Sequence, residues 1–86
     1  MEPQQAYVKK RKDWYVVKQA SIKSVFGSSP ERTEFTETTH KTPENLVNHL
    51  YSLPEGSGIT LDLETRGSLD EKSKERLDEL DPSILN

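Results

Sequence analysis

Apolar residues in the first third of the chain are mostly β-branched or aromatic, and their spacing predicts strands. A first strand is expected at Ala6–Val8, with a turn near Lys12 and Asp13, and a longer second strand continues to Phe26. Alternate side chains of a strand share one face, so the even positions form the expected core face of the second strand: Trp14, Val16, Ala20, Ile22 and Phe26.

A threonine-rich segment, Arg32–His40, predicts a third strand after a turn over Gly27–Glu31. Phe35 is its one large apolar residue, so this strand has little to bury and is expected at an edge of the sheet. Charged side chains such as Glu34 and Glu37 are typical of edges that discourage uncontrolled strand pairing. Docking of a strand from a partner is the functional alternative for this edge.

Thr42 and Pro43 mark the start of a helix, because threonine caps free N–H groups and proline has its φ angle preset at the first helical position. The helix is expected to end before Pro54 and to bury one stripe, formed by Leu46, Val47, Leu50 and Leu53. The strict alternation in Ile59–Glu64 predicts a fourth strand with one covered face.

A capping box formed by Ser68 and Glu71 predicts a second helix that continues to about Leu80 and lies on the surface. The expected fold is therefore one small α+β domain over residues 1–86, with element order β-β-β-α-β-α. The first three strands form an antiparallel meander, and the first helix returns the fourth strand beside the first. Residues 1–5 and 82–86 are expected to be flexible ends of this domain.

Composition narrows the possible functions. The 86 residues include no cysteine and carry a net charge of −3, and no apolar run approaches the roughly 18 residues that would span a membrane. We therefore expect a cytoplasmic protein. Seven basic residues oppose three acidic ones in residues 1–32, whereas five oppose twelve in residues 33–86, so the chain is basic first and acidic last.

Enzyme motifs are weak in this chain, and no catalytic residue, metal or cofactor is expected. Ser57 lies between two glycines but lacks the strand-to-helix context of a catalytic serine. His40 and His49 are expected at a surface or at the border of the helix stripe. Asp62 and Glu64 would lie about 7 Å apart on one strand face, a spacing used by paired carboxylates, but so short a chain offers little room for a substrate cleft.

Nucleic-acid binding is supported by cations that accompany aromatic rings near the first turn. Lysine and arginine attract phosphates, and exposed rings stack on unpaired bases. The candidate residues are Lys9, Lys10, Arg11, Lys12, Tyr15, Lys18 and Lys23, with Trp14 beside them. Two features oppose this function: the isoelectric point near 5.3 is low, and Trp14 lies on the expected core face.

Binding of another protein is the function that the sequence favours, because small size and missing motifs are typical of regulators, inhibitors, immunity proteins and adaptors of bacteria or viruses. An acidic surface could face a basic partner. Its candidate residues are Glu64, Glu71, Glu75, Asp78, Glu79 and Asp81. A homodimer is a further expectation, since so thin a core gains stability from association, and weak nucleic-acid binding by the Lys9–Lys12 segment is the alternative function.

Overall fold

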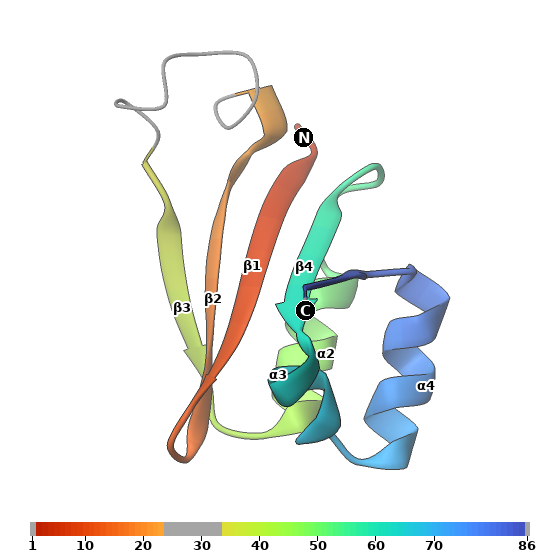
Figure 1. The fold of residues 1–86 in the computed structure, drawn as a ribbon. Helices are drawn as coiled ribbons and strands as arrows, with labels where there is room; N and C mark the ends of the chain where they lie inside the picture. The colour runs from red at the N-terminus through yellow and green to blue at the C-terminus, as the bar shows by residue number, and fades with distance from the viewer. Residues whose placement is uncertain (1, 24–33, 86) are drawn as a thin grey trace.

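The computed structural model describes residues 2–23 and 34–85 and confirms the α+β class (Figure 1). A mixed sheet of five strands, in the order β3-β2-β1-β4-β5, carries two longer helices on one face. The elements are β1 (Gln4–Arg11), β2 (Trp14–Ser21), β3 (Thr36–His40), α2 (Pro43–Tyr51), β4 (Gly58–Asp62), α3 (Leu63–Gly67), α4 (Glu71–Leu80) and β5 (Ser83–Leu85). Among the described residues, no helix combines the length and apolar character that crossing a membrane requires.

Strand pairing confirms the meander and the predicted position of the fourth strand. β1 and β2 form an antiparallel hairpin that turns at Lys12 and Asp13, and β3 pairs antiparallel with the far side of β2. The helix α2 then returns the chain so that β4 lies parallel to β1, with Val8 beside Leu61. The predicted turn at Gly27–Glu31, and the residues Phe26, Arg32 and Thr33, lie outside the described residues.

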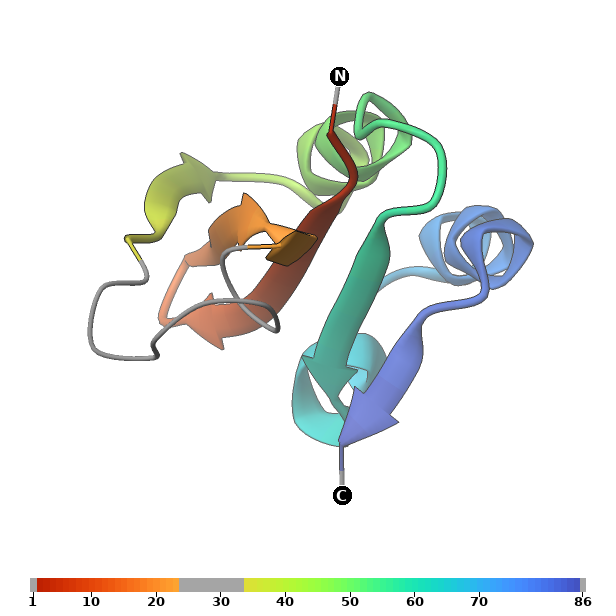
Figure 2. The same ribbon diagram turned by 90° about the horizontal axis from the view of Figure 1, so that it is seen from above.

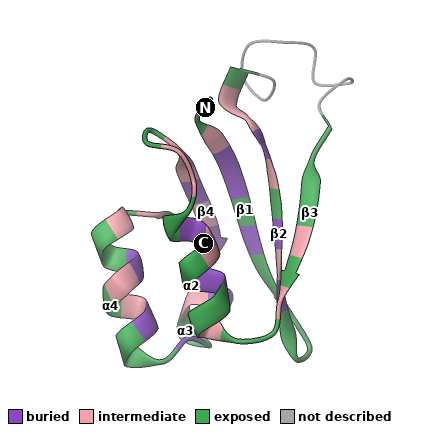
Figure 3. Ribbon diagram, turned by 180° about the vertical axis from the view of Figure 1, so that it is seen from behind, coloured by how far each residue is buried: buried purple, intermediate pink, exposed green. Residues whose placement is uncertain are grey.

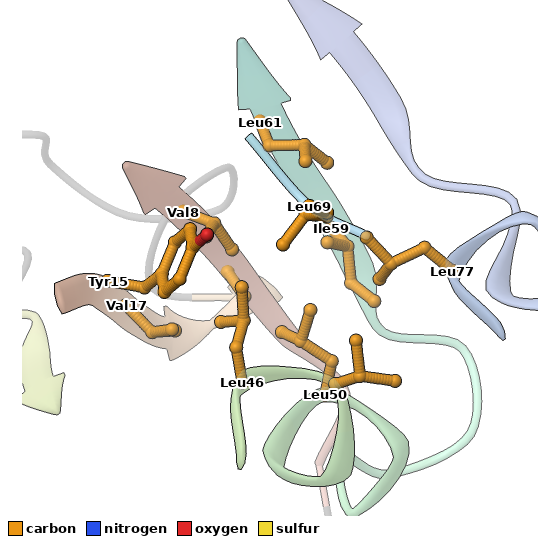
Figure 4. Close-up of a cluster of buried hydrophobic side chains, with 11 residues drawn as sticks. Val8, Tyr15, Val17, Leu46, Leu50, Ile59, Leu61, Leu69 and Leu77 are labelled. Atoms are coloured by element: carbon orange, nitrogen blue, oxygen red, sulfur yellow. The ribbon is translucent and has the colours of Figure 1, made fainter. Parts of the chain in front are cut away.

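The core lies between the sheet and the helices α2 and α4, which cover the same face of the sheet (Figure 2). In Figure 3, the residues coloured as buried lie along the strands of the sheet and on parts of the helices α2 and α4. The close-up in Figure 4 labels nine members of this cluster, namely Val8, Tyr15, Val17, Leu46, Leu50, Ile59, Leu61, Leu69 and Leu77.

The predicted core face of β2 is wrong, because Tyr15 and Val17 are the residues that face the helices. Both faces of this strand carry apolar side chains, so alternation within β2 could not decide between them. The neighbouring strand decides it: Val8 pairs with Val17 across the hairpin, and opposed residues of paired strands point to the same face. Trp14 consequently lies on the other face, with 37% of its surface exposed.

The helix α2 begins as predicted. Thr42 Oγ1 accepts a hydrogen bond from the Asn45 N–H at 3.1 Å, and Pro43 occupies the first turn. Leu46, Val47 and Leu50 are buried, which confirms the expected stripe.

The chain after β4 differs from the prediction. The strand ends at Asp62, whose side chain accepts a hydrogen bond from the Thr65 N–H at 2.7 Å and caps a short helix, α3. Glu64 therefore lies in a helix, and the predicted carboxylate pair on one strand face is wrong. Ser68 ends α3 instead of starting α4, which begins after Asp70 without a side-chain cap. The final residues Ser83–Leu85 form an unpredicted strand parallel to β4.

Candidate functional site

One face of the sheet remains uncovered by α2 and α4, and Figure 1 looks onto it. We call it the open face. Alternation along the strands places there the side chains that point away from the core. They include Tyr7, Lys9 and Arg11 of β1, Trp14, Val16 and Lys18 of β2, Glu37 and Thr39 of β3, and Thr60 and Asp62 of β4.

A depression of about 270 Å³ lies at the centre of the open face. Val16 and the Tyr7 ring contribute apolar surface to its lining, and the other side chains of the open face around it are polar or charged. These are Lys9, Arg11, Lys18, Thr60 and Asp62. This arrangement combines an apolar surface with a few converging polar groups, which is typical of sites for small ligands or for parts of larger ones.

Aromatic side chains lie on both sides of the cations. Trp14 is directly opposite Arg11 in the register of the hairpin. Tyr7, which is 36% exposed, lies four residues away along β1, a distance of about 13 Å. The Tyr7 ring meets the Phe35 ring edge to face, with 5.9 Å between the centroids. The open face therefore presents rings at two positions with Lys9 between them.

The cations of the open face are exposed and lack partners among the described residues. The ion pairs found in that part of the chain join Arg66 to Asp78 and Lys74 to Glu71, away from the open face. Two carboxylates lie beside these cations without forming an ion pair. Glu37 is directly opposite Lys18, and Asp62 follows Leu61, the partner of Val8, and so lies beside Lys9. Hydrogen bonding from Thr65, helped by the charge of Lys9, holds the pKa of Asp62 below its usual range. Asp62 is therefore ionised at neutral pH.

The structure brings together Lys9, Arg11 and Lys18 of the predicted nucleic-acid residues and separates the others. Tyr15 cannot stack on a base, because it is only 4% exposed and its hydroxyl lies 3.0 Å from Ser68 Oγ on the helix-covered side. Lys10 pairs with Tyr15 and so points to that side as well. Lys12 is at the turn with a φ angle of 28°, and Lys23 is exposed beyond the other end of β2.

Sequence reasoning missed Tyr7, Thr60 and Asp62 as members of this site. The signal for Tyr7 was present, because Tyr7, Lys9 and Arg11 alternate with Val8 along one strand. No local signal places Thr60 and Asp62 beside them, since their approach depends on the parallel pairing of β1 with β4.

The predicted acidic surface is partly occupied by contacts within the chain. Asp78 pairs with Arg66, and the Tyr51 hydroxyl donates a hydrogen bond to Glu79 Oε2 at 2.6 Å. This bond raises the pKa of Tyr51 above its ordinary value. Glu71 lies 3.8 Å from Lys74. The remaining members, Glu64, Glu75 and Asp81, are exposed.

Two histidines from consecutive elements meet between β3 and α2. The rings of His40 and His49 lie with their centroids 4.6 Å apart at an angle of 35°. His49 Nε2 is 2.7 Å from Gln19 Oε1, and His40 Nε2 is 3.0 Å from Thr38 Oγ1. Burial lowers the pKa of both rings, and the charge of His49 lowers that of His40 further. The pair therefore favours the neutral form, and it joins the edge strand to the helix.

We expect this pair to make the protein less stable at pH 5.5 than at pH 7.5. In the unfolded chain each histidine has a pKa near 6.5, above its value in the fold, so the unfolded state binds more protons as the pH falls. The stabilising contribution is fully present above pH 6.5 and is lost as the pH falls through the lower folded-state pKa values. Urea unfolding at both pH values should show a smaller pH dependence for the His40→Gln, His49→Gln variant than for the wild type. An equal dependence in the two proteins would contradict the assignment.

The other chemical candidates have structural roles. The Ser57 hydroxyl accepts a hydrogen bond from the Gln4 N–H at 2.9 Å and donates one to the Pro54 carbonyl at 2.6 Å, which holds the loop before β4. Among residues 2–23 and 34–85, no group of three metal-ligating side chains is close enough to hold an ion.

Three comparisons with known proteins found no match for this chain. No protein-family model matches the chain, and no match is found among curated proteins or among solved structures.

Proposed function

We propose that this protein is a non-catalytic module that binds single-stranded nucleic acid through the open face of its sheet. The observation that carries this proposal is the position of Trp14, exposed and directly opposite Arg11 on the face that also holds Lys9 and Lys18. Cations in a groove track the phosphates of a strand, and exposed rings offer platforms on which bases stack.

The geometry suits a single strand better than a duplex. Bases of a single strand can turn toward a flat surface and stack on it, whereas those of a duplex are stacked on each other and face its grooves. Trp14 and Tyr7 lie on the two sides of Lys9 along the hairpin, so a strand that followed β1 would meet a ring, a cation and a second ring in turn.

The low isoelectric point does not oppose this proposal. The acidic residues are concentrated after residue 33, and four of them, Glu71, Glu75, Asp78 and Glu79, lie on α4, which covers the other face of the sheet. Association depends on the local field of the surface that meets the ligand, not only on the net charge. The argument that Trp14 belongs to the core is removed by its exposure.

Titration with a twelve-nucleotide DNA of mixed sequence, followed by the fluorescence of the single tryptophan, tests the proposal. We expect quenching and an affinity that falls with salt. Replacing Lys9 and Lys18 by glutamine should lower the slope of log affinity against log salt concentration by about 1.4, at about 0.7 for each cation on a single strand.

The matched control replaces Lys72 and Lys74 of α4 by glutamine, the same chemical change with the same loss of charge. We expect this variant to bind as the wild type does. An equal loss of affinity in the two variants would indicate a nonspecific charge effect. Absence of binding by the wild type would overturn the proposal.

A protein partner, which the sequence favours, is the second candidate. Glu64, Glu75 and Asp81 support it, because they are exposed and form no ion pair with a described residue. Replacing Glu64 and Glu75 by glutamine and Asp81 by asparagine removes three charges, and asparagine tolerates the φ angle of 52° at position 81. A protein that is retained stoichiometrically by the wild type and lost by this variant would support the acidic surface. Sedimentation at several concentrations checks the expected homodimer.

A further inference from the structure

The depression on the open face has an unequal distribution of hydrogen-bonding groups. Cations lie on the β1 and β2 sides, whereas Thr60 and Asp62 approach from β4. A carboxylate is not suited to a phosphate, which it repels. If a nucleic acid occupies the open face, the β4 side must therefore contact something other than the backbone of the strand.

Asp62 can accept further hydrogen bonds. A carboxylate offers about four acceptor positions, and Thr65 occupies only part of them. The ionised state of Asp62 makes it an acceptor alone, and Lys9 beside it offsets its repulsion of a nearby phosphate.

Thr60 is oriented as a donor. Its Oγ1 accepts a hydrogen bond from Gln5 Nε2 at 3.0 Å, so its own hydroxyl hydrogen is available for another group. Gln5 is held in place, because its side chain lies over Gly58, where a Cβ atom would come within 2.4 Å of Gln5 Oε1. The β4 side of the depression thus presents a donor at Thr60 and a charged acceptor at Asp62, two residues apart on one strand.

We infer that this depression is a nucleobase pocket in which Asp62 and Thr60 select cytosine over thymine. The inference rests on the proposed function. Cytosine offers an amino donor at N4, whereas thymine has an acceptor at O4. The amino group would donate to Asp62, and the ring nitrogen next to it would accept from Thr60. In the same pose, thymine would place its O4 lone pairs against the carboxylate and its N3–H against the Thr60 hydroxyl, so that neither hydrogen bond could form.

Fluorescence anisotropy with labelled oligonucleotides of twelve deoxycytidines or twelve thymidines tests the selection, at about pH 7.5. We expect the wild type to bind the cytidine strand about tenfold more tightly, in the lower part of the range for a pair of base contacts. Asp62→Asn should reduce this ratio to about one, because an amide both donates and accepts. Asparagine is also a good N-cap residue, so the helix α3 should persist in this variant.

Two further variants keep the test decisive. Glu37→Gln removes the same charge from the same face but lies outside the described lining of the depression, so the tenfold ratio should remain. Thr60→Val keeps the shape and removes the hydroxyl, and we expect it to reduce the ratio to about threefold. It tests the pocket independently if Asp62→Asn does not fold.

The outcomes separate this inference from the proposed function. Equal binding of both strands by the wild type, with loss on replacing Lys9 and Lys18, would overturn the selection and leave nucleic-acid binding standing. A cytidine preference that survives both Asp62→Asn and Thr60→Val would also overturn it. Absence of binding to either strand would overturn the inference and the proposed function together.

Discussion

Replacing Leu50 by alanine lowers the free energy of unfolding by about 2–4 kcal/mol, which is the usual cost of removing a buried leucine side chain. Leu50 lies in the middle of α2 and is only 2% exposed within the cluster of core residues. A domain of this size has a total stability of about 4–13 kcal/mol, so the substitution removes a large part of it. Urea unfolding followed by circular dichroism measures the loss.

Asn45→Ala is the matched control, since Asn45 is exposed on the same helix and its side chain makes no hydrogen bond with a described residue. We expect a change within about 0.5 kcal/mol. Asn48 is less suitable as a control, because its Oδ1 accepts a hydrogen bond from Arg76 Nη2 at 2.8 Å. If Asn45→Ala lowered the free energy of unfolding more than Leu50→Ala does, the buried side of α2 would be wrongly assigned.

Trp14→Ala weakens oligonucleotide binding by about tenfold or more, if the proposed function holds. Stacking of a base on an aromatic side chain contributes about 1–3 kcal/mol, and Trp14 is the largest exposed ring on the open face. Anisotropy of a labelled strand measures the loss, because the variant has no tryptophan fluorescence. Trp14→Phe should retain most of the affinity, since it keeps a flat ring.

Tyr51→Ala provides the control for this prediction. Tyr51 is exposed to a similar extent, at 39%, but it lies on α2, where Arg76 packs over its ring. We expect its loss to leave binding unchanged. Weakened binding by Tyr51→Ala together with unchanged binding by Trp14→Ala would place the contact surface on the helical side.

Local patterns predicted the elements that carry their own signals. Thr42 and Pro43 define the start of α2, and the alternation in β4 was strict enough to assign its buried face. The capping box at Ser68 did not form, because the Tyr15 hydroxyl and the Thr65 carbonyl contact the Ser68 side chain and α3 ends there. Local propensity is compatible with Ser68 either at the start of α4 or at the end of α3. The tertiary contact with Tyr15 favours the end of α3.

The candidate site was predictable only in part. The cations of β1 and β2 stand out in the sequence, but which of them share a face depends on the register with Val8 and Val17. The contact between His40 and His49 joins a strand to a helix, and no residue spacing along the chain predicts it. For a site assembled from several strands, the sequence can therefore indicate candidate residues, but it does not predict how these residues are arranged in space.

The central position of β1 also constrains the order in which the molecule can form. Residues 5–8 are made early, yet their parallel partners at residues 58–61 are made after most of the chain. On the ribosome, the first hairpin must wait for α2 and β4 before its apolar side is covered. The chain loses conformational entropy when so long a loop closes, and the contacts between β1 and β4 offset this loss only after they form. This slows folding. Substitutions that weaken the pairing of β1 with β4 should therefore prolong a state in which the hairpin is exposed to aggregation and proteolysis.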